Sequence, residues 1–184
     1  MYRRTTAILC LIVVGCTSVA FADGGKGKKK RICVEVSYAA FIPSDGDTRS
    51  NFDEVWSSIG VGRFIPERPN HWAFDWDVTW LDEQGVSDAD LIPLTAGVQR
   101  GLGIHRDRQP YVTVRVGPYY GDVDHNTKGP DATKIGLNAN ASLGVILKQK
   151  YFLEARYDLF SRLAGNNFNG FTFTGGVKVL EFSL

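Results

Sequence analysis

The chain has 184 residues, of which 21 are basic and 20 acidic, and its formal net charge is +1. Such a balance creates no field that would attract nucleic acid. Glycine, at 20 residues, and aromatic side chains, at 12%, are plentiful, whereas there is one methionine. This composition favours β structure.

The N-terminus has the pattern of a secretory signal. Two arginines precede an apolar run over residues 7–14, which is far shorter than the roughly 20 residues that a membrane-spanning helix needs. Ala20-Phe21-Ala22 predicts cleavage before Asp23, giving a signal peptide over residues 1–22. Val13-Val14-Gly15-Cys16 offers an alternative, because it resembles a lipoprotein processing site with Cys16 as the acylated residue; we favour the cut after Ala22.

Residues 23–31 form a glycine- and lysine-rich stretch that we interpret as a flexible basic leader. The remaining segment, 32–184, is predicted to be one β domain. Cys33 is the one cysteine beyond Ala22, so no internal disulfide is possible after cleavage there.

Period-two alternation, which places every second side chain on one face of a strand, recurs along this domain. In residues 71–80, Trp72, Trp76 and Trp80 share one face, and Asp75 and Asp77 share the other. Residues 134–147 alternate for about 13 residues, which is long for a globular strand but suits an oblique membrane crossing. With less regular segments included, eight strands are predicted, over 31–42, 55–65, 71–80, 91–102, 111–120, 134–147, 151–159 and 171–179.

The connections favour hairpin-linked strands. Those over 43–52, 82–90, 121–132 and 161–169 are polar and mostly long, whereas 66–70 and 148–150 are short. This asymmetry is typical of membrane barrels, with tight turns at one end and longer loops at the other. The sequence therefore predicts an all-β fold, a closed antiparallel up-and-down barrel of about eight membrane-spanning strands, with the four polar loops at one end.

Alternation alone fits two kinds of barrel, because a soluble carrier has its apolar faces inside and a membrane barrel has them outside. Aromatic residues near segment ends, and polar faces that mix glycine, serine, asparagine and both charge signs, favour the membrane barrel. The expected interior charge network comprises Glu35, Asp75, Asp77, Arg115, Lys134, Glu154, Arg156, Asp158 and Lys178, with Arg115 or Arg156 as its hub. The expected lipid-facing residues and aromatic girdle comprise Tyr38, Trp72, Trp76, Trp80, Tyr120, Leu137, Tyr151, Phe171 and Phe173.

The stretch from Tyr151 to Asp158, followed by Gly170 to Val179, resembles the terminal hairpin of small bacterial outer-membrane barrels. That superfamily includes the outer-membrane protein A transmembrane domain and the outer-membrane protein W family. The resemblance implies a location in the outer membrane, and contacts with membrane lipids and with the barrel-assembly machinery, which reads an aromatic residue ending the last strand. Here Phe182 is followed by Ser183 and Leu184.

Three functions remain open. The first is a structural or surface-interaction barrel whose extracellular partner the sequence does not identify. The second is a carrier of small ligands, soluble or membrane-bound. The third is a lipid-modifying enzyme, since the lipid A deacylases resemble this chain in size and C-terminal pattern and rely on a His-x-Ser pair. No such pair occurs here, and the nearest substitute is His125 with Thr127. A nucleophile without a base cannot be activated, so catalysis is not expected. No cofactor or metal site is predicted.

Overall fold

The computed structural model describes residues 31–65, 71–84, 87–103, 107–124, 132–163 and 165–183. These residues form eight strands and one short helix, and the expected signal peptide and most of the leader lie outside them. The elements are β1 (Arg31–Pro43), α2 (Gly46–Asn51), β2 (Trp56–Phe64), β3 (Trp72–Gln84), β4 (Asp88–Gly101), β5 (Arg108–Asp124), β6 (Ala132–Leu147), β7 (Tyr151–Phe160) and β8 (Gly170–Ser183).

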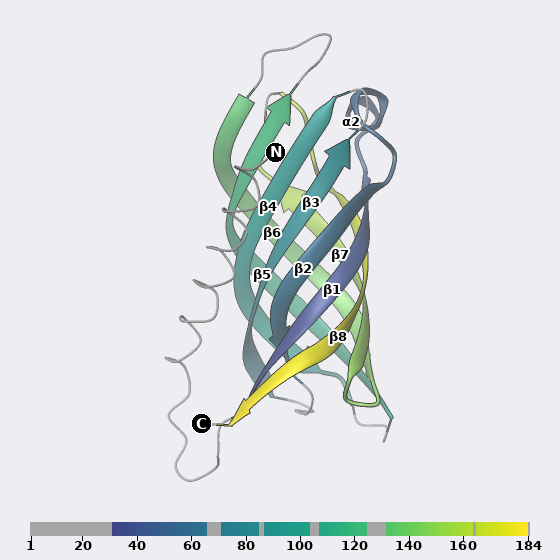
Figure 1. The fold of residues 1–184 in the computed structure, drawn as a ribbon, viewed down its shortest axis with the longest axis vertical. Helices are drawn as coiled ribbons and strands as arrows, with labels where there is room; N and C mark the ends of the chain where they lie inside the picture. Colours follow the sequence, from purple (N-terminus) through teal and green to yellow (C-terminus); the bar gives the residue numbers. More distant parts are fainter. Residues whose placement is uncertain are drawn as a thin grey trace.

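Each strand pairs antiparallel with its neighbours in the sequence, and β1 pairs with β8 to close the barrel. The prediction of eight strands in an up-and-down barrel is confirmed. The strands cross the barrel obliquely (Figure 1), and β1 begins at the same end at which β8 finishes. We call this the terminus end and the opposite end, where α2 lies, the loop end. Within the described residues, no helix is long and apolar enough to cross a bilayer.

The connection expected over 82–90 is shorter than predicted. β3 continues to Gln84 and β4 begins at Asp88, and Asp82 pairs with Asp90 within the sheet. The aspartates looked like loop residues, but they occupy outward positions while Leu81 and Leu91 are fully buried inside. The alternation of inward and outward side chains therefore continues to the loop end of these strands. There the inward residues stay apolar, whereas the outward residues change from apolar to polar.

A β-turn closes the β6–β7 hairpin at the terminus end, with the Lys150 backbone N–H donating to the Leu147 carbonyl at 3.1 Å. Its two central residues, Lys148 and Gln149, both have positive φ, at 50° and 54°. This is the backbone geometry of the type I′ turn, whose twist matches that of the flanking strands. The turn usually carries asparagine and glycine, whereas this chain places a lysine at its corner.

The loop end is tied together by α2. The Asp45 side chain caps the helix by accepting from the Thr48 backbone N–H at 3.0 Å, which is a favourable N-terminal contact. The hydrogen bonds from Thr48 hold the pKa of Asp45 below its ordinary value. The Thr48 hydroxyl also donates to the Asn167 carbonyl at 3.0 Å. The loop after β1 is thereby joined to the loop before β8.

Candidate functional site in the barrel interior

Side chains of different character fill the barrel interior in three layers. An apolar cluster fills the loop end, and a smaller one fills the terminus end. Between them lies a layer of buried polar and charged residues that the middle parts of the strands contribute. The loop-end cluster, called the aromatic cap below, comprises Phe41, Phe52, Trp56, Leu81, Ala89, Leu91, Tyr119, Val123, Phe160, Leu163 and Phe168.

The aromatic cap closes the loop end through rings that contact one another. Phe168 lies 5.6 Å from Phe52 and 5.6 Å from Trp56, measured between ring centroids, and Trp56 lies 5.4 Å from Phe41. Tilted and edge-on ring pairs at these distances are favourable beyond the area that they bury. Trp56 also donates its indole N–H to the Asp53 carbonyl at 2.8 Å. The cap combines inward residues of the strands with three loop residues, Phe52, Leu163 and Phe168.

The aromatic cap differs from the uniformly polar interior that the sequence pattern predicts. The phase of β7 does carry a signal for it, since Phe160 follows Phe152, Glu154, Arg156 and Asp158 at every second position and must face inward with them. No such periodicity applies to Phe52 and Phe168, because they lie in connections.

Arg115 is one of two cationic centres of the polar layer. Its Nε donates to Asp75 Oδ2 at 2.6 Å and its Nη1 lies 3.4 Å from Glu154 Oε1. The Tyr111 hydroxyl donates to the other oxygen of Glu154 at 2.9 Å. A planar guanidinium can serve two carboxylates at once, and here it bridges β3 and β7 across the barrel from β5.

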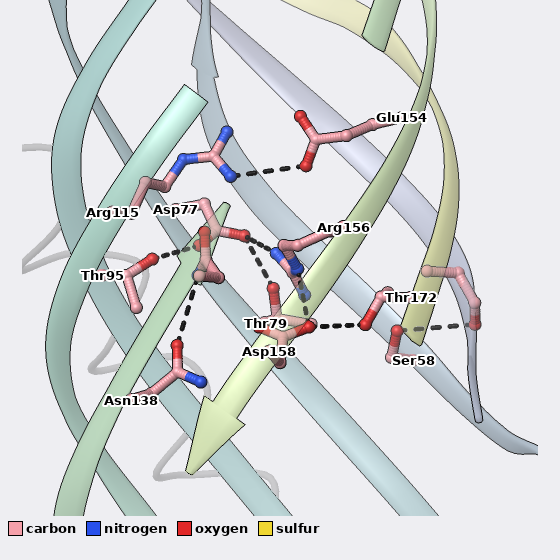
Figure 2. Close-up of polar contacts among 12 residues, drawn as sticks. Ser58, Asp77, Thr79, Thr95, Arg115, Asn138, Glu154, Arg156, Asp158 and Thr172 are labelled. Carbon is pink, nitrogen blue, oxygen red and sulfur yellow. Dashed lines mark hydrogen bonds and ion pairs between the residues drawn. The ribbon is translucent and has the colours of Figure 1, made fainter. Parts of the chain in front are cut away.

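Arg156 is the second centre, on β7 (Figure 2). Its Nε lies 2.9 Å from Asp158 Oδ2 and its Nη1 lies 3.0 Å from Asp77 Oδ2. Hydroxyl groups donate further hydrogen bonds to both carboxylates. Thr95 and Thr79 donate to Asp77 at 2.6 and 2.8 Å, and Thr172 donates to Asp158 at 2.6 Å. Charge-assisted hydrogen bonds of this length are strong, and they link four strands through one buried network.

Three expected members of the network lie elsewhere or lack a partner. Lys134 has the inward phase of β6 but lies beyond the closed part of the barrel, where its exposed ammonium group donates to the Arg162 carbonyl at 2.8 Å. Lys178 is opposite Glu35 in the register, yet its Nζ lies 3.0 Å from Glu181 Oε2, nearer the terminus end. A register shift between Val34 and Glu35 places Glu181 opposite the inward-facing Cys33, within reach of Lys178. Among the described residues, no hydrogen bond or ion pair reaches the Glu35 carboxylate.

Some buried oxygens of the polar layer have no hydrogen-bond partner among the residues that the structure describes. They include Asp75 Oδ1, Asp158 Oδ1, Thr113 Oγ1 and Ser142 Oγ. Buried polar atoms normally find a hydrogen-bond partner, so the layer has capacity for ordered water between the two apolar clusters. Within the described parts of the chain, no three histidine, cysteine, aspartate or glutamate side chains are arranged to hold a metal ion.

The outer surface is apolar and exposed around the barrel. Leu137 is 65% exposed, Leu143 63% and Val116 59%, and outward residues of all eight strands show the same character. A monomer in water rarely exposes a continuous apolar surface of this extent. The distribution is the reverse of a soluble carrier, in which the apolar side chains would line the cavity and the charges would face water.

The expected aromatic residues occupy several levels of this surface. Trp80, Tyr120 and Phe171 lie toward the loop end, and Trp72 and Tyr151 toward the terminus end. Tyr38 and Phe173 are well exposed, at 63% and 53%, but their pairing partners place them near the middle of the strands rather than at an interface.

Trp76 differs from its expected lipid exposure, because it is only 7% exposed although it has the outward phase of β3. In the register Gly62 pairs with Asp77, so Arg63 stands beside Trp76 on the outer face. The Arg63 guanidinium donates to the Phe74 carbonyl at 2.7 Å, so its side chain reaches across to β3 on the outer face. A long side chain of this kind can cover apolar surface while its charged end bonds elsewhere.

A polar, charge-paired interior inside an apolar outer surface defines a membrane-spanning β-barrel. No protein-family model and no curated protein matches the chain. Solved structures do: Neisserial surface protein A is 17% identical, with 81% of this chain and 95% of that chain covered and a TM-score of 0.51. The attachment invasion locus protein Ail of Yersinia pestis is 17% identical over 84% of this chain and all of that chain, also with a TM-score of 0.51.

The outer membrane enzyme PagL is similar in fold as well, at 11% identity, with 79% of this chain and 99% of that chain covered and a TM-score of 0.53. At these identities the likeness concerns the fold alone. The chain therefore has the fold of the small bacterial outer-membrane barrels, and its structural relatives include both an enzyme and surface proteins.

Proposed function

We propose that this protein is a closed, non-catalytic anchor of the bacterial outer membrane that presents its loop end at the cell surface. In this proposal the chain is exported through the signal at residues 1–22, with lipidation at Cys16 as the alternative. It is inserted by the barrel-assembly machinery and contacts membrane lipids through its outer face. The observation that carries the proposal is the combination of an exposed apolar outer surface with an interior closed at both ends by apolar clusters.

The interior supports an anchor better than a channel. The polar layer holds Arg115 and Arg156 in contacts with four carboxylates, and the aromatic cap fills the barrel above it. An eight-stranded barrel is just wide enough for side chains to fill it. These two arginines and four carboxylates thus pair with one another, and the apolar clusters on either side of them favour a closed interior.

Planar-bilayer recording of the refolded full chain tests the closed interior. We expect no discrete conductance steps in 1 M KCl, and insertion is verified in the same preparation by the change in gel mobility on boiling. Reproducible steps from inserted protein would contradict the proposal. They would favour a passage for small solutes instead.

A lipid-modifying activity is the second candidate, and the likeness in fold to the outer membrane enzyme PagL favours it. Against it stands the absence of a His-x-Ser pair in the sequence; His125 and Thr127 lie outside the described residues. Mass spectrometry of lipid A from cells expressing the chain tests this candidate. We expect a spectrum identical to that of control cells, and a loss of acyl mass that disappears in the His125→Ala variant would establish the enzyme.

A further inference from the structure

The two ends of the barrel carry opposite charge. Among the described residues, acidic side chains predominate at the loop end, where Asp82, Asp90 and Asp122 are neighbours across β3, β4 and β5. Basic side chains predominate at the terminus end, where the acidic ones are Glu35, Asp107 and Glu181. The basic residues of that end are Arg63, Arg100, Arg108, Lys148, Lys150 and Lys178.

A groove of about 590 Å³ runs over the outer face of β6, β7 and β8 toward the terminus end. It is apolar, and its floor is low because Ala155 and Gly175 present little or no side chain between larger neighbours. The residues of the outer face that line it are Leu143, Val145, Leu153, Ala155, Phe173 and Gly175.

The groove leads to a positive charge. Tyr151 lies on the same outer face of β7 as Leu153, two residues closer to the terminus end. Lys150 Nζ lies 5.4 Å from the centroid of the Tyr151 ring. Lys148, which is exposed, lies two residues away at the corner of the turn. The Lys178 backbone N–H donates to the Lys150 carbonyl at 2.8 Å, which fixes the turn beside β8.

The groove covers about two thirds of the depth of one leaflet of a bilayer. From Ala155 to Tyr151 the strand advances about 13 Å, at roughly 3.3 Å per residue, which at the usual barrel tilt of about 35–45° corresponds to about 10 Å along the bilayer normal. One leaflet of a hydrocarbon core is about 15 Å thick. A lipid whose acyl chain lies in the groove therefore has its headgroup at the level of Tyr151 and Lys150.

We propose that this groove and the lysines of the β6–β7 turn form a binding site for one anionic phospholipid of the leaflet at the terminus end. The acyl chain packs between Leu153 and Phe173 over Gly175, and the phosphate contacts Lys148 and Lys150. The charge of the two ends selects the leaflet, because the acidic residues of the loop end would repel an anionic headgroup there. The inference rests on the proposed membrane location and adds the identity of a lipid partner.

The variants that test the site are chosen from the local geometry. Lys148→Gln/Lys150→Gln removes the charge. Gly175→Leu fills the groove without disturbing the fold, because a Cβ at Gly175 would meet only Leu153 Cδ2, at 3.5 Å. Ala96→Leu also introduces a leucine at an exposed position, on β4 away from the groove, and Arg49→Gln removes a charge at the loop end, so these two variants are the controls.

The experiment is native mass spectrometry of the full chain in detergent doped with equimolar phosphatidylglycerol and phosphatidylcholine. We expect preferential retention of one phosphatidylglycerol. Each basic residue near a membrane surface contributes about 1 kcal/mol, which corresponds to about fivefold, so the double lysine variant should lower that retention about 25-fold. Gly175→Leu should lower the retention of both lipids, and both controls should match the wild type.

Equal retention of the two lipids by the wild type, or unchanged retention in both test variants, would overturn the site. The change in gel mobility on boiling is recorded for the same samples. A wild type that shows this change but no lipid preference refutes the lipid site and leaves the membrane anchor standing. A wild type that lacks the mobility change refutes the anchor itself.

Discussion

Arg115 Nε lies 2.6 Å from Asp75 Oδ2 in the middle of the barrel, and the two side chains are only 5% and 1% exposed. The contact joins β5 to β3, which are separated by β4 in the sheet. It therefore connects strands through the interior rather than along the wall. Two charges buried this deeply are tolerable only because each has a partner.

A double-mutant cycle measures this coupling. We expect Asp75→Asn and Arg115→Met to interact by about 0.5–3 kcal/mol in the free energy of unfolding, as residues in one buried network do. The control pair is Lys178 and Glu181, whose atoms are also close, at 3.0 Å, but whose side chains are 24% and 37% exposed. Exposed pairs contribute about 0.2–1 kcal/mol. A coupling no larger at Arg115 than at Lys178 would refute an interior held by charge pairing.

Arg156→Met tests the second centre of the network. Removal of the guanidinium leaves Asp77 and Asp158 without a cation, and breaking a buried pair in this way costs about 3–5 kcal/mol. We expect a clear drop in the midpoint of urea-induced unfolding in detergent, measured by tryptophan fluorescence. Arg49→Met, at an exposed position of α2, should leave the midpoint unchanged. A similar loss in both variants would mean that the network does not stabilise the barrel.

Glu35 should behave differently from the other interior carboxylates. It lies within electrostatic reach of Asp75, Asp77 and Glu154, and although Arg115 also attracts it, that guanidinium already contacts Asp75 and Glu154. An inward carboxylate near like charges is unfavourable, so Glu35→Gln should maintain or raise the urea midpoint at pH 8. Glu154→Gln should lower it, because Glu154 accepts from Tyr111 and pairs with Arg115. The reverse order of the two midpoints would show that Glu35 has a stabilising partner.

The outer surface can be tested at two depths. Val114, which is 54% exposed in the middle of β5, faces the centre of the bilayer in the proposed orientation. Val114→Arg should reduce folding into vesicles, since an arginine at the bilayer midplane costs about 2–4 kcal/mol. Ser57→Arg, at an outward position of β2 near the loop end, should cost about 0–1 kcal/mol. Equal folding yields for the two variants would contradict this membrane boundary.

Strand number and topology could be predicted from the sequence because period-two alternation over long segments leaves little other choice. The burial of β7 follows that alternation, with Phe152, Glu154, Arg156 and Asp158 all buried. The ends of the strands were harder to predict. β3, β4 and β5 extend beyond the apolar surface into water, where both faces of a strand can be polar and the pattern resembles a loop.

Phase predicts which face a side chain occupies, but not how far along the barrel axis it lies. Lys134 and Asn138 share the inward phase of β6, yet Lys134 is exposed and Asn138 is fully buried. Register between strands decides this depth, and a single sequence does not carry it. The ion-pair partner of Lys178 also depends on register, namely on the irregular pairing of β1 with β8 at Val34.

The proposed function requires that the chain spans the outer membrane as a closed barrel. The most direct measurement is fractionation of bacteria that express the full chain, followed by electrophoresis of each fraction with and without boiling. We predict that the protein is found in the outer-membrane fraction, resists extraction by urea washing, and migrates faster before boiling than after it. Recovery in the soluble fraction, with one mobility under both conditions, would contradict the account.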